Sequence, residues 1–155
     1  MKLLLQHVRI DDKDLNGLAG PHIIIEGANV HIQSGTGTSG DGSGPIGLGN
    51  LIIGYNEVAP NATPARTGSH NLVIGAQHTY TSHGGLVAGQ QNTISGPYAS
   101  VSGGRQNFAR GEGASISGGK YAEINELAPE GTWHGGGVWS NGQVTSLRVL
   151  EILGQ

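Results

Sequence analysis

The sequence predicts an all-β fold, a parallel β-roll or β-solenoid with coils of about 14 residues. The first observation is a five-residue motif with a closing glycine, found at 50–54, 71–75, 85–89, 99–103 and 114–118. From the second copy onward the closing glycines are 14, 14 and 15 residues apart. The second observation is the composition: 29 of 155 residues are glycine and 12% are charged, against about 25% charged in ordinary globular domains. Such a period is typical of one supersecondary unit stacked on its own copies.

The composition also excludes several functional classes. A net charge of −3 provides no basic stripe for a phosphate backbone, so we expect no nucleic-acid partner. With no cysteine, the chain has no disulfide and no thiol chemistry, which suits an oxidising environment. The apolar run Leu3–Leu5 is shorter than a signal-peptide core, and no stretch approaches the ~20 apolar residues of a transmembrane helix. We therefore expect no direct membrane insertion and see no signal peptide.

Residues 1–33 are predicted to form an N-terminal β cap. Apolar and polar residues alternate at 3–10, 22–26 and 29–33, which indicates three strands. The polar run 11–17 between the first two indicates a turn. The cap is expected because the ends of a solenoid need units unlike its repeats.

Two loop segments are expected before and within the repeats. Residues 34–47 are rich in glycine and serine, so we expect them to be mobile or clamped by a partner chain. The repeat region itself covers 48–125. It is interrupted at 58–66 by an insertion whose two prolines exclude it from the interior of a sheet.

Each repeat is predicted to supply one strand, a sharp corner and a second strand. The motif's third residue is always β-branched, as suits a side chain stacked in a narrow interior. These residues form the predicted structural spine: Ile52, Val73, Val87, Val101 and Ile116. The corner glycines are Gly54, Gly75, Gly89, Gly103 and Gly118, where we expect a positive φ or a close backbone approach. The second strand is predicted to point Tyr80, Ile94, Ala109 and Ile124 inward.

The residues flanking the spine predict association. They are apolar in the first three copies of the motif, for example Leu72 and Ile74, and become serines in the last two. Strands that are apolar on both faces are usually covered on both faces. The interior of so thin a roll buries little apolar surface, so we expect closed symmetry to cover the flanks. The prediction is a side-by-side homotrimer.

Residues 126–155 break the period and are predicted to form a C-terminal β cap. Asn141-Gly142 lies between strand-forming residues and indicates a type I′ hairpin. Three aromatic side chains, Trp133, His134 and Trp139, are expected to pack inside this cap, and stacking on a glycan is the alternative.

The repeats resemble the head repeats of trimeric autotransporter adhesins of the YadA type. The resemblance covers about residues 48–125 and lies in the units Asn-Leu-Val-Ile-Gly, Leu-Val-Ala-Gly and Ser-Val-Ser-Gly-Gly. It implies a left-handed parallel β-roll that trimerises side by side. It also implies a bacterial surface or virion-spike module that binds a host matrix protein or glycan, placed on the extracellular side.

Catalytic and metal-binding patterns are weak. The seven histidines include no His-x-x-x-His pair beside a carboxylate, so no zinc site is expected. The double glycines resemble those of calcium-binding rolls, but no acid lies between Glu57 and Glu112 to ligate calcium. Ser69-His70 and Ser82-His83 lack an acid that would orient a base. We expect no catalytic residue, no metal and no cofactor, so the chain is interpreted as a non-enzymatic protein.

One polar column is a candidate binding surface. Gln77, Gln91, Arg105 and Lys120 each stand two residues after a closing glycine, with Arg110 close in sequence. Aromatic residues available for stacking are Tyr98, Phe108 and Tyr121. The predicted ligand-binding set is Tyr98, Arg105, Phe108, Arg110 and Lys120, and the alternative is a solvated polar ladder. The function predicted overall is a structural or adhesive module, with a carbohydrate-binding solenoid or a phage tail-fibre component as alternatives.

Overall fold

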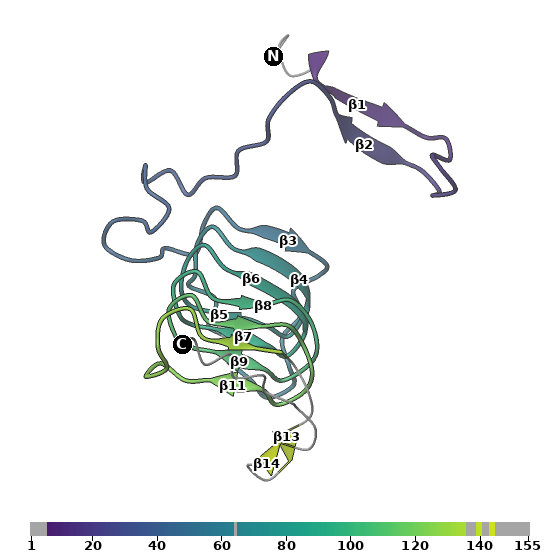
Figure 1. Ribbon diagram of the computed structural model, residues 1–155. Helices are drawn as coiled ribbons and strands as arrows, with labels where there is room; N and C mark the ends of the chain where they lie inside the picture. Colours follow the sequence, from purple (N-terminus) through teal and green to yellow (C-terminus); the bar gives the residue numbers. More distant parts are fainter. Residues whose placement is uncertain (1–5, 64, 136–138, 141–142, 145–155) are drawn as a thin grey trace, which may run out of the picture. The chain divides into compact units, whose positions relative to one another are not determined.

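The computed structural model describes residues 6–63, 65–135, 139–140 and 143–144, and it is all-β (Figure 1). The described residues fall into two compact units, one within residues 1–31 and one within residues 32–155. Parallel coils stacked on one another make up the second unit, as the sequence predicts. Among the described residues, no helix has the length and hydropathy that crossing a membrane requires.

The first unit contains an antiparallel hairpin. Its strands β1 (Val8–Asp11) and β2 (His22–Ile25) pair Val8 with Ile25 and Ile10 with Ile23. The third strand expected at 29–33 is wrong, because these residues have irregular backbone. An isolated alternating segment becomes a strand only when a neighbouring strand accepts its backbone hydrogen bonds, and no described residue does so here.

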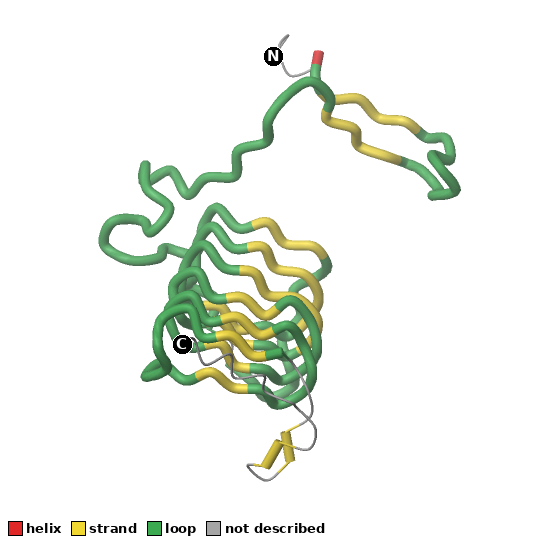
Figure 2. The backbone as a smooth tube through the Cα atoms, viewed as in Figure 1, coloured by secondary structure: helices red, strands yellow, loops and turns green. Residues whose placement is uncertain are grey.

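The second unit is a roll with two parallel sheets. Figure 2 shows short strands (yellow) joined by long loop segments (green) around each coil. The larger sheet has the order β12-β10-β8-β6-β4-β3, and the smaller has the order β11-β9-β7-β5. The larger sheet contains β3 (Leu51–Ile53), β4 (Leu72–Ala76), β6 (Leu86–Gln90), β8 (Ser100–Val101), β10 (Ser115–Ile116) and β12 (Trp133–His134). The smaller contains β5 (Thr79–Tyr80), β7 (Thr93–Ile94), β9 (Phe108–Ala109) and β11 (Glu123–Ile124).

Each sheet points one stacked column of side chains into the roll. In the larger sheet Val73 pairs with Val87, Val87 with Val101 and Val101 with Ile116, and all four are fully buried. In the smaller sheet the inward column is Tyr80, Ile94, Ala109 and Ile124, which confirms the predicted inward residues. Ile52 pairs with Val73 but is 41% exposed, because β3 is the last strand at its edge of the sheet.

In the last two copies the corner column is displaced by one residue from the predicted Gly103 and Gly118, although Gly118 has the predicted positive φ, +148°. A Cβ added to Gly75 or Gly89 would overlap a carbonyl oxygen of the next coil, and both have φ near +100°. The residue that continues this column is Gly104, not Gly103. Gly104 has φ +79°, whereas a Cβ at Gly103 would meet nothing within 4 Å. The coil that contains β8 therefore has one residue more than a 14-residue coil, and this residue lies between Val101 and the corner at Gly104. The column of corner glycines is Gly54, Gly75, Gly89, Gly104 and Gly119.

The loop at 34–47 is held by hydrogen bonds within its own chain. Asp41 is buried and accepts hydrogen bonds from the hydroxyls of Ser34 and Thr36 and from the N–H of Ile46. Ser69 Oγ also accepts from the Ile46 N–H at 3.0 Å. The prediction of a loop that is mobile or clamped from outside missed Asp41, whose carboxylate organises the backbone around it.

The stack continues beyond the predicted repeat region. β12 pairs in parallel with β10, which places Trp133 beside Ser115, inside the segment predicted to be a cap. Further on, β13 (Trp139–Ser140) and β14 (Gln143–Val144) pair antiparallel with Trp139 opposite Val144. That pairing is the hairpin predicted around Asn141-Gly142, whose own two residues lie outside the described part of the chain.

Candidate functional site

The predicted polar column is out of register by one residue. In the structure Ala76, Gln90, Arg105 and Lys120 form one column, and Arg105 bridges to both Gln90 and Lys120. Gln77 and Gln91 belong to the next column, which has left-handed backbone at φ +64° and +57°. Arg105 and Lys120 are thus neighbours on adjacent coils, at the corner between the two sheets.

The cations of the predicted set have partners from the same chain. Arg105 Nε donates to Gln91 Oε1 at 3.1 Å, and Lys120 Nζ lies 4.6 Å from the centre of the Tyr121 ring. Arg110 lies 5.0 Å from the centre of the Phe108 ring, and its Nε is 3.1 Å from Glu123 Oε1. Glu123 neutralises Arg110, so this arginine offers no free charge to an anionic ligand. Exposed pairs of this kind contribute about 0–1 kcal/mol each to stability.

Tyr98 does not join these residues. It precedes β8, whereas Arg105 follows it, so the two stand at opposite ends of that strand. Tyr98 is 57% exposed, and its ring meets the His83 ring edge-on with centres 5.0 Å apart. The five predicted ligand-binding residues therefore occupy at least two separate places on the roll.

A buried polar ladder runs through the corners, and sequence reasoning missed it. His78, Asn92 and Asn107 are fully buried at equivalent places in successive coils. The backbone N–H of Asn92 donates to His78 Nδ1 at 3.2 Å, and that of Asn107 donates to Asn92 Oδ1 at 2.9 Å. The sequence signal was present: each of the three follows a glutamine, at spacings of 14 and 15 residues. The ladder is structural, because its polar atoms point into the coils.

The histidine of this ladder is held neutral. Its Nε2 lies 3.0 Å from Ile74 O and donates to it, and Nδ1 accepts from the Asn92 N–H. Burial lowers the pKa of His78 below its ordinary value of 6.5, because desolvation disfavours the charged ring. Protonation of His78 Nδ1 would place its N–H against the N–H of Asn92, so the hydrogen bond between them would be lost.

The outer face of the larger sheet is divided into two halves. We call the outward side chains of β3, β4 and β6 the apolar half; they are Leu51, Ile53, Leu72, Ile74, Leu86 and Ala88. We call the outward serines in and directly after β8 and β10 the serine half; they are Ser100, Ser102, Ser115 and Ser117. Leu51 and Ile53 are 46% and 52% exposed, while Leu72 and Ile74 are half-buried. Neither half carries a charged side chain.

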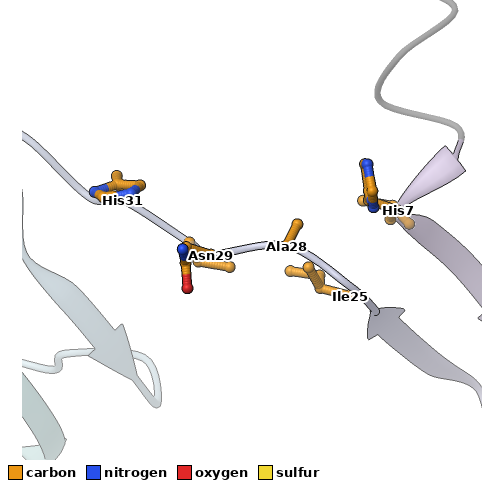
Figure 3. A pocket seen from close by; sticks show the side chains of 7 residues that line it. His7, Ile25, Ala28, Asn29 and His31 are labelled. Atoms are coloured by element: carbon orange, nitrogen blue, oxygen red, sulfur yellow. The ribbon is translucent and has the colours of Figure 1, made fainter.

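The first unit contains an open hollow (Figure 3). It lies along the end of the hairpin and is lined by His7, Val8, Ile25 and residues 28–31. The rings of His7 and His31 stand at opposite ends of this row, and the lining between them is mostly apolar. Among the described residues, no three acidic, histidine or cysteine side chains group together as metal ligands. The hollow brings together no set of polar groups that could orient a ligand.

Comparisons with protein-family models, with characterised proteins and with solved structures find no match for this chain. The resemblance to adhesin head repeats therefore remains a prediction from the motif alone.

Proposed function

We propose that this chain is a non-enzymatic structural module that assembles as a homotrimer through the apolar half of the outer face. The observation that carries the proposal is an apolar surface, free of charge, on three adjacent parallel strands. Exposed apolar patches of this kind mark sites of protein association. Parallel strands are usually covered on both faces, and on this face Leu51 and Ile53 are exposed while Leu72, Ile74 and Leu86 are half-buried.

The interior of the roll supports the same conclusion. Each coil contributes one inward side chain from each sheet, such as Val87 and Ile94, and otherwise mainly small or polar buried residues such as Ala99 and Asn92, so the apolar core is narrow. A narrow core offsets little of the conformational entropy that a glycine-rich chain loses on folding. Burial of Leu72, Ile74 and Leu86 between copies would supply additional apolar area. Closed three-fold symmetry covers the same face on every copy.

The proposed role follows from this assembly. Stacked parallel coils make a rigid module that can display surface side chains at regular spacing. We propose that the trimer acts as an adhesive or fibre-like module exposed at a cell or virion surface. The absence of cysteine supports this setting, because the fold requires no reducing compartment.

Light scattering on the purified full chain at micromolar concentration tests the assembly. The expected mass is three times 15.9 kDa. Ile74→Lys places a charge on the apolar half without touching the spine, so it should yield a folded monomer with an unchanged circular dichroism spectrum. Thr93→Lys is the matched control on the outer side of the smaller sheet, and it should remain trimeric. A wild-type monomer, or an Ile74→Lys trimer, would contradict the proposal.

A further inference from the structure

A tryptophan stands on the outer face, one strand beyond the serine half. Trp133 pairs with Ser115 in the adjacent strand, so its side chain leaves the sheet on the same face as the serines. A Cβ added to Gly135 would lie 2.8 Å from Cη2 and 3.3 Å from Cζ2 of the indole. The six-membered ring therefore covers Gly135, and a larger residue there would push it off the sheet. The predicted packing of Trp133 inside a cap is wrong: it is 64% exposed.

The orientation of this indole is set by a hydrogen bond. Nε1 donates to Ser117 Oγ at 3.0 Å, which satisfies the one polar group of the side chain. With the six-membered ring against Gly135 and the N–H bonded to Ser117, the side-chain surface left to solvent is apolar ring surface. An ordered aromatic face of this kind attracts C–H groups that carry partial positive charge.

Hydroxyl groups line the approach to the ring. Ser100 Oγ donates to Ser115 Oγ at 3.1 Å, and Ser102 Oγ donates to Ser117 O at 3.2 Å. The Ser115 hydroxyl keeps its own proton for another acceptor, since the described residues provide none. No outward residue of β8, β10 or β12 in the described part of the chain is charged. The surface thus combines one apolar ring face with neutral hydroxyls.

We propose that Trp133 and the serine half form a binding site for a neutral oligosaccharide. One pyranose ring would stack its C–H face on the exposed indole, and hydroxyls of the neighbouring unit would exchange hydrogen bonds with Ser115 and Ser100. The chemistry of the surface matches this ligand, because a pyranose has an apolar C–H face and a rim of hydroxyls without charge. The site is separate from Arg105 and Lys120, and it lies on β8, β10 and β12, the half of the sheet away from the apolar half.

The test uses the full chain with Trp139→Phe, which leaves Trp133 as the one tryptophan of the sequence. Tryptophan fluorescence is titrated with cellotetraose, xylotetraose and N-acetylated chitotetraose, and the affinities are measured by calorimetry. We expect a saturable change in emission with at least one of the three. Trp133→Ala should then weaken binding at least about ten-fold, and Ser115→Ala about three-fold.

Two further variants test whether binding requires the position of the indole and not only an exposed aromatic ring. Gly135→Val retains the indole but displaces it from the sheet, so binding should also weaken while the fold is unchanged by circular dichroism. Tyr98→Ala removes an aromatic ring of similar exposure elsewhere on the roll, and binding should not change. Absence of binding to all three sugars at millimolar concentration would overturn the proposal, as would full affinity in Trp133→Ala. Light scattering on the same samples separates the two proposals: a trimer that binds no sugar overturns this site, whereas a sugar-binding monomer overturns the assembly.

Discussion

Asn92 Oδ1 accepts a hydrogen bond from the backbone N–H of Asn107, its counterpart one coil further along, at 2.9 Å. The Asn92 amide also donates, to Ala88 O at 2.6 Å and to Gly104 O at 3.0 Å. One fully buried side chain therefore satisfies three backbone groups on two coils. The same role passes to Asn107, whose Oδ1 accepts from the Ala122 N–H. The two asparagines tie successive corners together.

Asn92→Ala is expected to lower the free energy of unfolding by about 3 kcal/mol, because buried backbone donors and acceptors lose their partners. The measurement is urea denaturation of both proteins at the same concentration, so that any contribution of assembly to stability is compared at equal concentration. Asn29→Ala is the matched control, since Asn29 is exposed and lies outside the roll. It should change stability by less than about 0.5 kcal/mol. A loss of less than about 1 kcal/mol for Asn92→Ala would contradict the structural role of the ladder.

The architecture of the roll was predictable because one constraint repeats. Every coil must place a β-branched side chain over the one before it, so the spine and the inward residues of the second strand stand out in the sequence. The exact corner was not predictable in the same way. Gly103 and Gly104 are adjacent glycines, and the sequence does not distinguish the one that faces the carbonyl oxygen of the next coil, which is Gly104.

The candidate site was less predictable than the fold. Tyr98 and Arg105 are seven positions apart in the sequence, but they lie on opposite sides of β8 and do not form one site. The loop around Asp41 depends on long-range bonds, including that of Ile46 to Ser69, which composition cannot reveal. The exposure of Trp133 depends on Gly135, whose place beneath the ring follows from pairing of β12 with β10. A contact that occurs at one place in the chain leaves no repeated sequence pattern from which it could be predicted.

The two glycines of the fourth corner, Gly103 and Gly104, should respond differently to the same substitution. At Gly104, alanine would need φ +79° and would meet the carbonyl oxygen of Gly119, so Gly104→Ala should cost at least about 2 kcal/mol. At Gly103 a methyl group meets nothing within 4 Å, so Gly103→Ala should stay within about 0.5 kcal/mol of wild type. Thermal and urea unfolding of both variants provide the comparison. Equal losses would mean that the extra residue of this coil lies elsewhere.

The carboxylate of Asp41 should control the order of the loop at 34–47. Hydrogen bonds from Ser34 and neighbouring groups lower the pKa of Asp41 below its ordinary value. Asp41→Asn keeps the left-handed backbone at φ +59°, which asparagine tolerates, but it can present an NH₂ group to the Ile46 N–H. The Ile46 amide should then exchange its hydrogen at least about ten-fold faster, because one of its two acceptors is lost.

Asp14→Asn is the control for that experiment, since Asp14 is exposed and lies outside the roll. It should leave the Ile46 exchange rate unchanged. Because the pKa of Asp41 is lowered on folding, its contribution to stability is present above the ordinary value of 3.8 and is lost as the pH falls below it. Exchange at Ile46 that does not differ between Asp41→Asn and wild type would show that Ser69 alone orders the loop.

Acid should weaken the roll through His78. Its pKa is lowered by burial, so between the folded value and the ordinary value of 6.5 the unfolded chain binds a proton that the folded chain does not. Stability is therefore highest above pH 6.5 and falls as the pH drops below it. His78→Asn should remove this loss, because the asparagines of the next coils make the same pair of bonds: to the carbonyl four residues earlier and from the next N–H. Urea unfolding at pH 7.5 and 5.5 measures the difference. The six other histidines are common to both proteins, so an equal loss of stability in wild type and His78→Asn would assign the acid sensitivity to a different residue.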